Sequence, residues 1–396
     1  MSSRSIRDLD LKGRRLFLRV DFNVPLKNGV IGNDTRIRAA LPTIRYALDA
    51  GAACVVVASH LGRPKGRPRP EMSLGPVAAR LGALLGAPVA FASDCIGPDA
   101  ERTVQPAPAS RVVLLENLRF HPQEEQNDPA FAKALAALAD VYVNDAFGAA
   151  HRAHASVEAI VRLMPEAAAG LLMEQELRFL GDALSEPARP FVAILGGAKV
   201  SDKIEVINNL IPKVDRLIIG GAMAYTFFKA MGKPVGRSLV EDDKLDAARH
   251  IKTLASQRGL DLLLPSDHVV ADAIEAGAAI ETLDVHDDAI GTRMGLDIGP
   301  VTIAAYTASL ADARTVVWNG PMGVFEIDAF ARGTIAMATA VAEVNGTTIV
   351  GGGDSIAAVT KAGVADRITH ISTGGGASLE FLGGRTLPGV AVLPSA

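Results

Sequence analysis

Short apolar runs rich in β-branched residues recur along the chain, and each is followed by a polar or glycine-rich turn and then by a helical period. This order is typical of parallel strands that alternate with helices. In the first half, the pattern predicts strands in RRLFLRVDF, AACVVVAS, PVAFA, RVVLLEN and VYVND, which begin at Arg14, Ala52, Pro88, Arg111 and Val141. In the second half, it predicts strands in FVAILGG, DRLIIGG, DLLLPSD, TVVWNG, TTIVGGGD and THISTGGG, which begin at Phe191, Asp215, Asp261, Thr315, Thr347 and Thr369.

The same pattern divides the chain into two lobes. The segment LLMEQELRFLGDALSEPARP, from Leu171, has the spacing of an amphipathic helix that Pro187 and Pro190 interrupt, as expected of a connection between lobes. A chain of 396 residues is also longer than one domain with a single core usually is, and its length fits two domains. We therefore predict an α/β protein of two Rossmann-like lobes, each a mainly parallel sheet flanked by helices, joined by a hinge helix at residues 171–187.

Composition limits the partners that we expect. The chain has 40 basic and 44 acidic residues, a formal net charge of −4, so no overall positive field would hold nucleic acid. Its start, MSSRSIRDLD, lacks the apolar core of a signal peptide, and no apolar run approaches the roughly 18 residues of a membrane span. Cys54 and Cys95 stand outside the spacings of metal-binding cysteines. We expect a reduced, cytoplasmic protein without nucleic-acid or membrane partners.

Ligands of doubly wound sheets bind beyond the carboxyl ends of the strands, and the turns there differ between the two halves. Turns of the first half carry charged side chains suited to a small, multiply negative acid, because guanidinium groups bind phosphate and carboxylate with two hydrogen bonds. Taken singly, each arginine could be a solvated surface charge and each histidine an ordinary solvent-facing one, so only their shared position favours a site. The set comprises Asp21, Asn23, Arg36, His60, Arg63, Arg119 and Arg152.

Turns of the second half carry glycines, whose bare backbone N–H groups can approach nucleotide phosphates closely. In LGGAKVSDKIEVINNL, Gly196 and Gly197 end a predicted strand. A helix that begins near Ala198 would place Lys199 and Lys203 on one face near its positive end. Like charges at that spacing destabilise a helix, so a purely structural explanation leaves them unaccounted for. We therefore predict that the two lysines bind an anion.

A third motif, TTIVGGGDSIAAV, places glycines 351–353 at a predicted strand-to-helix junction. Asp354 could bind Mg²⁺ directly or through water, and Ser355 could cap the helix. The alternative is that one of these two side chains is only an N-cap and that the glycines only allow tight packing. Related features occur in STGGGASLEF, with Gly374, Gly375 and Gly376, and in WNGPMGVFE, with Asn319 and a ribose-binding candidate, Glu326.

Motifs of other nucleotide enzymes do not occur in the sequence. It contains no G-x-x-x-x-G-K-[ST], no G-x-G-x-x-G followed by an acidic residue at the right distance, and neither H-R-D nor D-F-G. The sequence is therefore not typical of a Walker-type ATPase, a dinucleotide dehydrogenase or a protein kinase.

The chain resembles the phosphoglycerate kinase family over essentially its whole length, through RVDFNVP, SHLGRPKG, LLENLRFH, VNDAFGAAHRAHAS, ILGGAKVSDKI, MGLDIGP, VWNGPMGVFE, GGGDSIAAV and STGGGASLEFL, in that order. The resemblance implies a phosphotransferase with a carboxyl group as acceptor. Such an enzyme exchanges a phosphoryl group reversibly between 1,3-bisphosphoglycerate and ADP, giving 3-phosphoglycerate and ATP, with Mg²⁺ as cofactor. It further implies a monomer, a phosphoglycerate lobe of residues 1–170 with the tail 380–396, and a nucleotide lobe of residues 188–379.

The resemblance also implies roles residue by residue. Phosphoglycerate binding falls on Asp21, Phe22, Asn23, Arg36, His60, Leu61, Gly62, Arg63, Arg119 and Arg152. Nucleotide binding falls on Gly197, Ala198, Lys203, Gly295, Asn319, Glu326, Gly352, Gly353, Asp354 and Ser355, with Asp354 as the magnesium contact. Catalysis falls on Arg36, Lys199, Lys203, Gly352 and Gly375. One departure is Arg293, where many members carry Trp before MGLDIGP, and it bears on the rim of the adenine pocket.

Transfer between a carboxylate and a phosphate needs no general base, so alignment and charge neutralisation by Arg36, Lys203, Mg²⁺ and helix N-termini would carry catalysis. Because acid and nucleotide would bind different lobes, we expect the cleft to close, with bending of the segment 171–187. The sequence leaves two alternatives open: a kinase for another small carboxylate or phosphate, and a catalytically silent nucleotide-binding or scaffold protein that keeps the fold. Intact Arg36, Lys203 and Asp354 argue against the second, because a silent protein could lose these charges freely.

Overall fold

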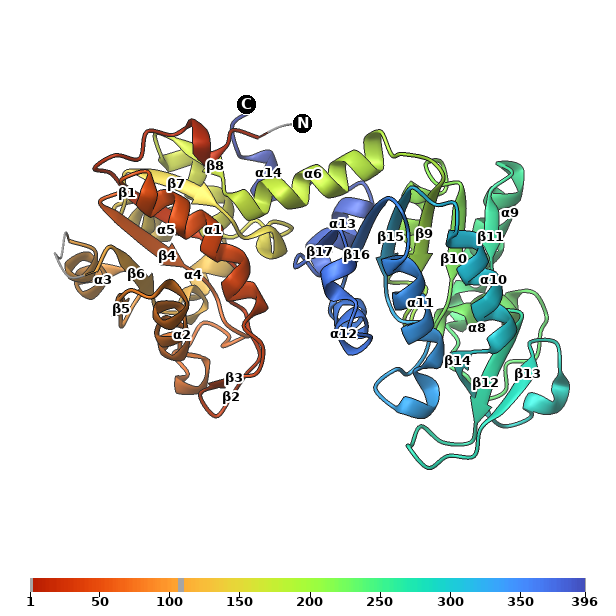
Figure 1. Ribbon diagram of the computed structural model, residues 1–396. Helices are drawn as coiled ribbons and strands as arrows, with labels where there is room; N and C mark the ends of the chain where they lie inside the picture. The colour runs from red at the N-terminus through yellow and green to blue at the C-terminus, as the bar shows by residue number, and fades with distance from the viewer. Residues whose placement is uncertain (1–2, 106–109, 396) are drawn as a thin grey trace. The chain divides into compact units, whose positions relative to one another are not determined.

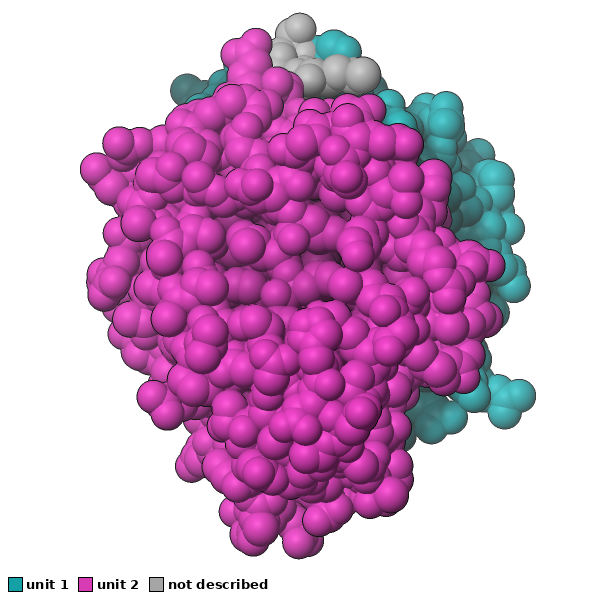
Figure 2. Space-filling model, turned by 90° about the vertical axis from the view of Figure 1, so that its right-hand side faces the viewer, with its two compact units in different colours: residues 1–178, 386–396 teal, residues 179–385 magenta. Residues whose placement is uncertain are grey.

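Two six-stranded parallel sheets organise the chain in a computed structural model that describes residues 3–105 and 110–395 (Figure 1). The sheets belong to two units, Met1–Arg178 together with Thr386–Ala396, and Phe179–Arg385 (Figure 2). Helices flank both sheets, so the predicted fold class is confirmed. No helix in the described part of the chain is long and apolar enough to cross a membrane.

The sheet of the first unit runs in the order β5 (Val89–Ala92), β6 (Val112–Leu115), β4 (Cys54–Ala58), β1 (Arg15–Arg19), β7 (Val141–Asn144) and β8 (Ala167–Ala169). Neighbouring strands in it are all parallel. Strands β4, β6 and β7 are buried along their whole length, because helices cover both faces of the sheet, and they therefore read as continuous apolar runs. The other elements of this part are α1 (Thr35–Asp49), α2 (Gly75–Leu85), α3 (Gly97–Val104), α4 (Pro122–Glu125), α5 (Pro129–Ala136) and the hairpin of β2 (Leu26–Lys27) and β3 (Val30–Ile31).

The sheet of the second unit runs in the order β11 (Asp261–Leu263), β10 (Arg216–Ile219), β9 (Phe191–Leu195), β15 (Thr315–Asn319), β16 (Thr347–Gly351) and β17 (His370–Ser372). An antiparallel sheet that the sequence did not predict adds β13 (Glu281–Asp284), β12 (Asp267–Ala271) and β14 (Met294–Ile298). The helices are α7 (Ile204–Leu210), α8 (Met223–Ala230), α9 (Leu245–Gln257), α10 (Pro300–Leu310), α11 (Arg332–Ala342), α12 (Gly353–Lys361) and α13 (Gly376–Leu382).

The connecting segment is one helix, α6 (Leu171–Ser185), which ends before Pro187 as the sequence predicts. The division between the units falls after Arg178, inside this helix, and not at its end. The C-terminal segment grouped with the first unit begins at Thr386 and includes α14 (Pro388–Ala391), whereas we predicted a tail from residue 380. The difference arises because Leu382 and Arg385 are tied to the second unit, the former by a 2.6 Å hydrogen bond from Asn209 Nδ2 to its carbonyl oxygen.

Each sheet carries its own apolar core. In the first unit the core gathers around Leu16, Leu18 and Val57, and in the second around Ile194 and Trp318. Because complete burial of one large apolar side chain stabilises a fold by roughly 1.5–3 kcal/mol, these cores hold the carboxyl ends of the strands in place. The turns that follow the strands are thereby positioned on rigid supports.

Candidate active site

The strands of the second unit end side by side at the carboxyl edge of its sheet. Asn319 pairs with Leu195 on one side and with Gly351 on the other, and Gly351 pairs with Ser372. The turns after these strands converge on a cavity of about 720 Å³. Its lining includes most of the predicted phosphate-binding residues, namely Gly197, Ala198, Lys199, Lys203, Asn319, Gly352, Gly353, Asp354, Ser355 and Gly375.

The turn before α12 requires glycine. Gly352 has φ 90° and ψ 139°, a conformation that residues with a Cβ rarely adopt. A Cβ at this position would also lie 2.9 Å from Asn319 Nδ2. No side chain caps α12, and Gly353 and Asp354 of its first turn are exposed at the cavity. The open N-terminus of this helix can donate hydrogen bonds to phosphate oxygens.

Lys203 is the most perturbed cation of this cavity. Its side chain is only 7% exposed, and its ammonium group donates a hydrogen bond to Asn319 Oδ1. Burial lowers the pKa of Lys203 to about 8, although the carboxylates of Asp202 and Asp354 act in the opposite direction. A buried ammonium group with a lowered pKa gains strongly from a phosphate that neutralises it.

The structure corrects the local geometry that we predicted for the two lysines. The helix begins at Ile204 and not near Ala198, so Lys199 and Lys203 precede it and do not share a helical face. Gly197 has φ +110° and residues 201–203 form a turn, closed by a 2.9 Å hydrogen bond from Lys203 N to Val200 O. Lys199 is exposed, whereas Lys203 is buried, yet both line the cavity.

Ser355 also differs from its predicted role. It does not cap α12, whose N-cap residue is Gly352. Its buried hydroxyl instead accepts a 2.6 Å hydrogen bond from Gly320 N, which ties the turn after β15 to the first turn of α12. Asp354 is exposed and lines the cavity, as a ligand of a nucleotide-bound cation would.

A second cavity of about 520 Å³ adjoins the first, and both are lined by Gly197, Ala198, Pro321 and Asp354. Its walls are mainly apolar, with Tyr225, Phe228, Met294, Leu296, Ile298 and Val324. The predicted residues Gly295 and Glu326 lie here too. Gly295 is required because a Cβ would overlap Tyr225 Oη at 1.4 Å. An apolar slot beside a phosphate cavity suits a nucleobase.

Arg293 is not among the residues that line this apolar slot. Its guanidinium group forms an ion pair with Glu281 and donates a hydrogen bond to the carbonyl oxygen of Ala289. Sequence reasoning missed several polar residues that line the slot, among them Arg237 and His268. Neither of these two stands in a recognised motif, so only the tertiary structure brings them to the site.

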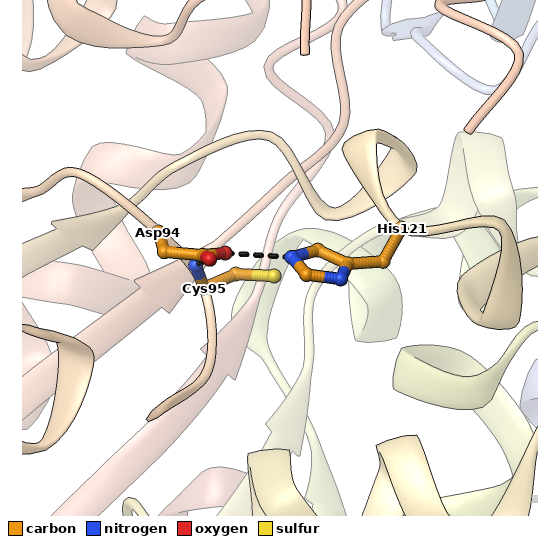
Figure 3. A group of neighbouring side chains, drawn as sticks. All are labelled: Asp94, Cys95 and His121. Atoms are coloured by element: carbon orange, nitrogen blue, oxygen red, sulfur yellow. Dashed lines mark hydrogen bonds and ion pairs between the residues drawn. The ribbon is translucent and has the colours of Figure 1, made fainter. Parts of the chain in front are cut away.

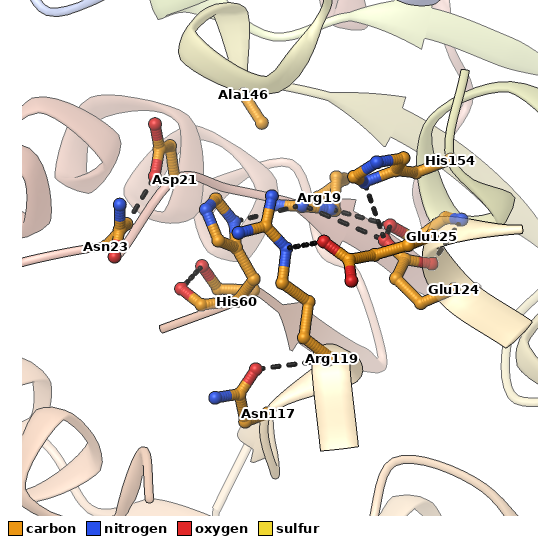
Figure 4. Close-up of polar contacts among 12 residues, drawn as sticks. Arg19, Asp21, Asn23, His60, Asn117, Arg119, Glu124, Glu125, Ala146 and His154 are labelled. Atoms are coloured by element: carbon orange, nitrogen blue, oxygen red, sulfur yellow. Dashed lines mark hydrogen bonds and ion pairs between the residues drawn. The ribbon is translucent and has the colours of Figure 1, made fainter. Parts of the chain in front are cut away.

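In the first unit, the predicted charged residues gather beyond the ends of β1, β4 and β6 (Figure 4). Arg36 Nη1 forms a 2.8 Å ion pair with Asp21 Oδ2. Asn23 Oδ1 accepts a 2.8 Å hydrogen bond from Gly62 N, and Arg119 Nη1 donates to Gly62 O at 2.9 Å. The turn at Gly62 therefore links Asn23 to Arg119.

Buried groups that the sequence did not reveal support this cluster. Arg19 is fully buried, and its guanidinium group contacts His60 Nδ1 at 3.3 Å and Ser156 Oγ at 2.8 Å. Burial and the neighbouring guanidinium groups keep the pKa of His60 well below its usual range and lower the pKa of His154 to about 3. Burial also lowers the pKa of Arg119 to about 10. Neutral histidines beside crowded arginines make surroundings that favour an anion.

Of the remaining predicted residues, two are buried and two are at least partly exposed. Phe22 and Leu61 are buried, and their backbone N–H groups donate to Ser59 Oγ at 2.8 Å and to Asn117 Oδ1 at 3.2 Å. These residues support the site and do not present side chains to it. Arg63 is exposed and Arg152 half-buried, with Arg152 Nε donating to His151 Nε2 at 3.1 Å.

The fold and these cavities define a class of protein: an α/β enzyme that handles a nucleotide at the carboxyl edge of a parallel sheet. The phosphoglycerate kinase family model matches residues 6–385, and the chain belongs to that family. The activity of the family is reversible phosphoryl transfer between 1,3-bisphosphoglycerate and ADP, which confirms the predicted function.

Known relatives cover the chain from end to end. Phosphoglycerate kinases of Solibacter usitatus and Koribacter versatilis are 61% and 59% identical to it, over 99% of this chain and 100% and 99% of theirs. The solved structure of phosphoglycerate kinase from Coxiella burnetii is 42% identical, with a TM-score of 0.87 over 98% of both chains. The structure from Pyrococcus horikoshii is 35% identical, with a TM-score of 0.85 over 98% of both chains.

Proposed function

We propose that Lys203 and Arg36 neutralise the phosphoryl group in flight and that a magnesium ion held at Asp354 assists them. The observation that carries this proposal is the buried ammonium group of Lys203 at the wall of a glycine-lined cavity. Since the carboxylate and the phosphate need no general base, electrostatic stabilisation of the transferring oxygens is the main catalytic requirement.

The nucleotide binds across the two adjoining cavities of the second unit. Its phosphates occupy the larger cavity, where Gly352, Gly353 and the first turn of α12 offer backbone N–H groups. Its base occupies the apolar slot beside Gly295, and Glu326 is placed for the ribose hydroxyls. Lys199, at the exposed rim, contributes charge to the phosphates.

Asp354 fits the cation that such nucleotides carry. Mg²⁺ prefers oxygen ligands and is held in phosphotransferases by one or two carboxylates together with the phosphates themselves. When bound, the ion neutralises charge that develops on the phosphate oxygens. The exposed carboxylate at the start of α12 lines both cavities and can reach the phosphates from either.

The acid binds to the cluster of the first unit. Arg63, Arg119, Arg152 and His60 bind its phosphate, Asp21 and Asn23 bind its hydroxyl group, and Arg36 faces the carboxyl end. The ion pair with Asp21 restricts the guanidinium group of Arg36 before substrate arrives. Because the two ligands bind to different units, transfer requires a conformational change that brings them together, with α6 as the hinge. We further propose that the enzyme works as a cytoplasmic monomer.

A trapping assay tests the proposal. Purified protein is incubated with Mg·ATP and 3-phosphoglycerate, and hydroxylamine converts the acyl phosphate to a hydroxamate. We expect hydroxamate only when the metal, ATP and this acid are all present, and less with a panel of other small carboxylates or phosphates. An unchanged rate after chelation of divalent metal would contradict the magnesium assignment, and a better rate with another acid would contradict the substrate assignment.

A further inference from the structure

A cluster of three potential metal ligands lies in the first unit. Asp94 and Cys95 occupy the turn between β5 and α3, and His121 precedes α4. One ligand atom from each residue lies within 4.8 Å of the others, and His121 Nε2 is 2.7 Å from Asp94 Oδ1. Figure 3 shows the carboxylate, the thiol and the imidazole directed toward one another.

The donor types are those that a zinc-type cation selects. Thiolate, imidazole and carboxylate together are borderline-soft ligands, unlike the all-oxygen set that Mg²⁺ prefers. Cys95 is a free thiol with no exposed surface, whereas the side chains of His121 and Asp94 are 26% and 46% exposed. The cluster therefore has a buried anchor and an opening through which an ion and a water molecule can enter.

A backbone hydrogen bond and a ring contact hold the donors in position. Cys95 N donates a 2.6 Å hydrogen bond to Asp94 Oδ1, which restricts the carboxylate. The His121 ring packs on Phe131, with 5.3 Å between ring centroids. Such support is typical of metal sites, whose ligands are oriented by a surrounding shell.

The alternative explanation of the cluster is an ordinary ion pair between Asp94 and His121 beside a core thiol. A metal site differs from this ion pair because Cys95 would become a thiolate ligand on metal binding, a change that the ion pair does not require.

We propose that Cys95 Sγ, His121 Nε2 and Asp94 Oδ1 bind one zinc-type divalent cation, with water as a further ligand. On binding, the Cys95 S–H bond breaks and its proton leaves to solvent, so each ion releases one proton from the thiol. This site lies in the first unit, and the magnesium-binding residue Asp354 lies in the second. A bound ion would join the turn after β5 to the segment that follows Arg119.

Cobalt(II) titration of the untagged, full-length protein tests the proposal, because thiolate ligation gives a charge-transfer absorption band. We expect this band to saturate at one cobalt ion per chain and to disappear when zinc(II) is added. The other cysteine, Cys54, is buried inside β4 and provides a matched control. C54S should keep the band and C95S should lose it.

Two further variants keep the test decisive if C95S is unstable. D94N and H121Q change partly exposed side chains. Loss of a residue that only supports a ligand lowers metal affinity by roughly 10- to 100-fold, so loss of a ligand itself in either variant should weaken cobalt binding by more than that. All three site variants should retain phosphoryl transfer, since none of these residues touches the proposed substrates. Absence of the band in folded wild-type protein, or its persistence in C95S, would overturn the proposal, as would unchanged affinity in both D94N and H121Q.

Discussion

The ammonium group of Lys203 donates a hydrogen bond to the side-chain oxygen of Asn319, and Asn319 Nδ2 in turn donates to Gly351 O at 2.9 Å. One chain of hydrogen bonds thus joins the segment that follows β9 to the last residues of β15 and β16. Because this network holds the charge that we propose to act in catalysis before any ligand binds, little reorganisation would remain for the moment of transfer. Lys203 is therefore a preorganised cation and not a mobile surface lysine.

Replacement of Lys203 by alanine should lower kcat by roughly 10²-fold or more, because a charge aimed at the transferring oxygens is lost. Steady-state kinetics with both substrates saturating provides the measurement. Lys229→Ala removes the same charge from an exposed position that pairs with Asp242 and should leave kcat nearly unchanged. Equal turnover in the two variants would remove Lys203 from the mechanism.

Nucleotide binding should take up a proton near pH 8 to 9. In the free protein burial lowers the pKa of Lys203 to about 8, so above that pH part of the population is neutral. Phosphates favour the ammonium form and raise this pKa, so binding draws in a proton and nucleotide affinity falls as pH rises through about 8. Calorimetric titration with Mg·ADP in buffers of different ionisation enthalpy measures the uptake. Lys203→Arg, whose guanidinium stays charged, should abolish it; uptake that persists in this variant would point to another group.

Replacement of Arg36 by alanine should also lower kcat by roughly 10²-fold while the protein remains folded, since this side chain is 30% exposed and lies outside the core. Arg38 lies on the same helix, α1, and pairs with Asp34 at 2.8 Å. Arg38→Ala is therefore the matched control, expected to retain turnover. Circular dichroism establishes folding and initial rates establish kcat; a normal kcat in Arg36→Ala would refute the role of Arg36.

Gly352→Ala should lower the free energy of unfolding by about 1–3 kcal/mol, because alanine is strained at φ 90°, ψ 139°. The added Cβ also crowds Asn319, so the KM for nucleotide should rise. The neighbouring Gly353 has an ordinary φ and open space around it, so Gly353→Ala should keep the stability of the wild type. Denaturant unfolding of both variants tests this difference, and identical midpoints would show that the turn tolerates a side chain.

The sequence predicted the parallel sheets because their strands are buried on both faces and read as apolar runs. It failed for the antiparallel sheet. In β13 only Leu283 is buried and the run ETLD has no apolar period, and β12 and β14 were missed although they are largely buried. β8 was missed because its sequence, AAA, has little strand preference. Local pattern thus predicted the strands of the two parallel sheets other than β8, and none of the antiparallel sheet.

The site was predictable where the residues of a turn themselves indicate phosphate binding, as the glycines before α12 do. The geometry of Lys203 was predicted wrongly because the turn at Gly197 delays the helix to Ile204. Arg19 was missed because a charged residue within an apolar strand gives no sign of its burial. Asp94 and His121 come together because β5 and β6 are neighbours in the sheet. The spacing of residues along the sequence does not show which strands are neighbours.

We propose that Lys203 and Arg36 stabilise the transition state more than they stabilise the bound substrates. The most direct measurement is the affinity of wild-type, Lys203→Ala and Arg36→Ala protein for a planar metal fluoride in the presence of ADP and 3-phosphoglycerate, a mimic of the transferring group. We predict that each variant loses affinity for this mimic by about the same factor as its kcat falls, while its affinity for ADP and 3-phosphoglycerate changes much less. Unchanged affinity for the mimic in both variants would contradict the account.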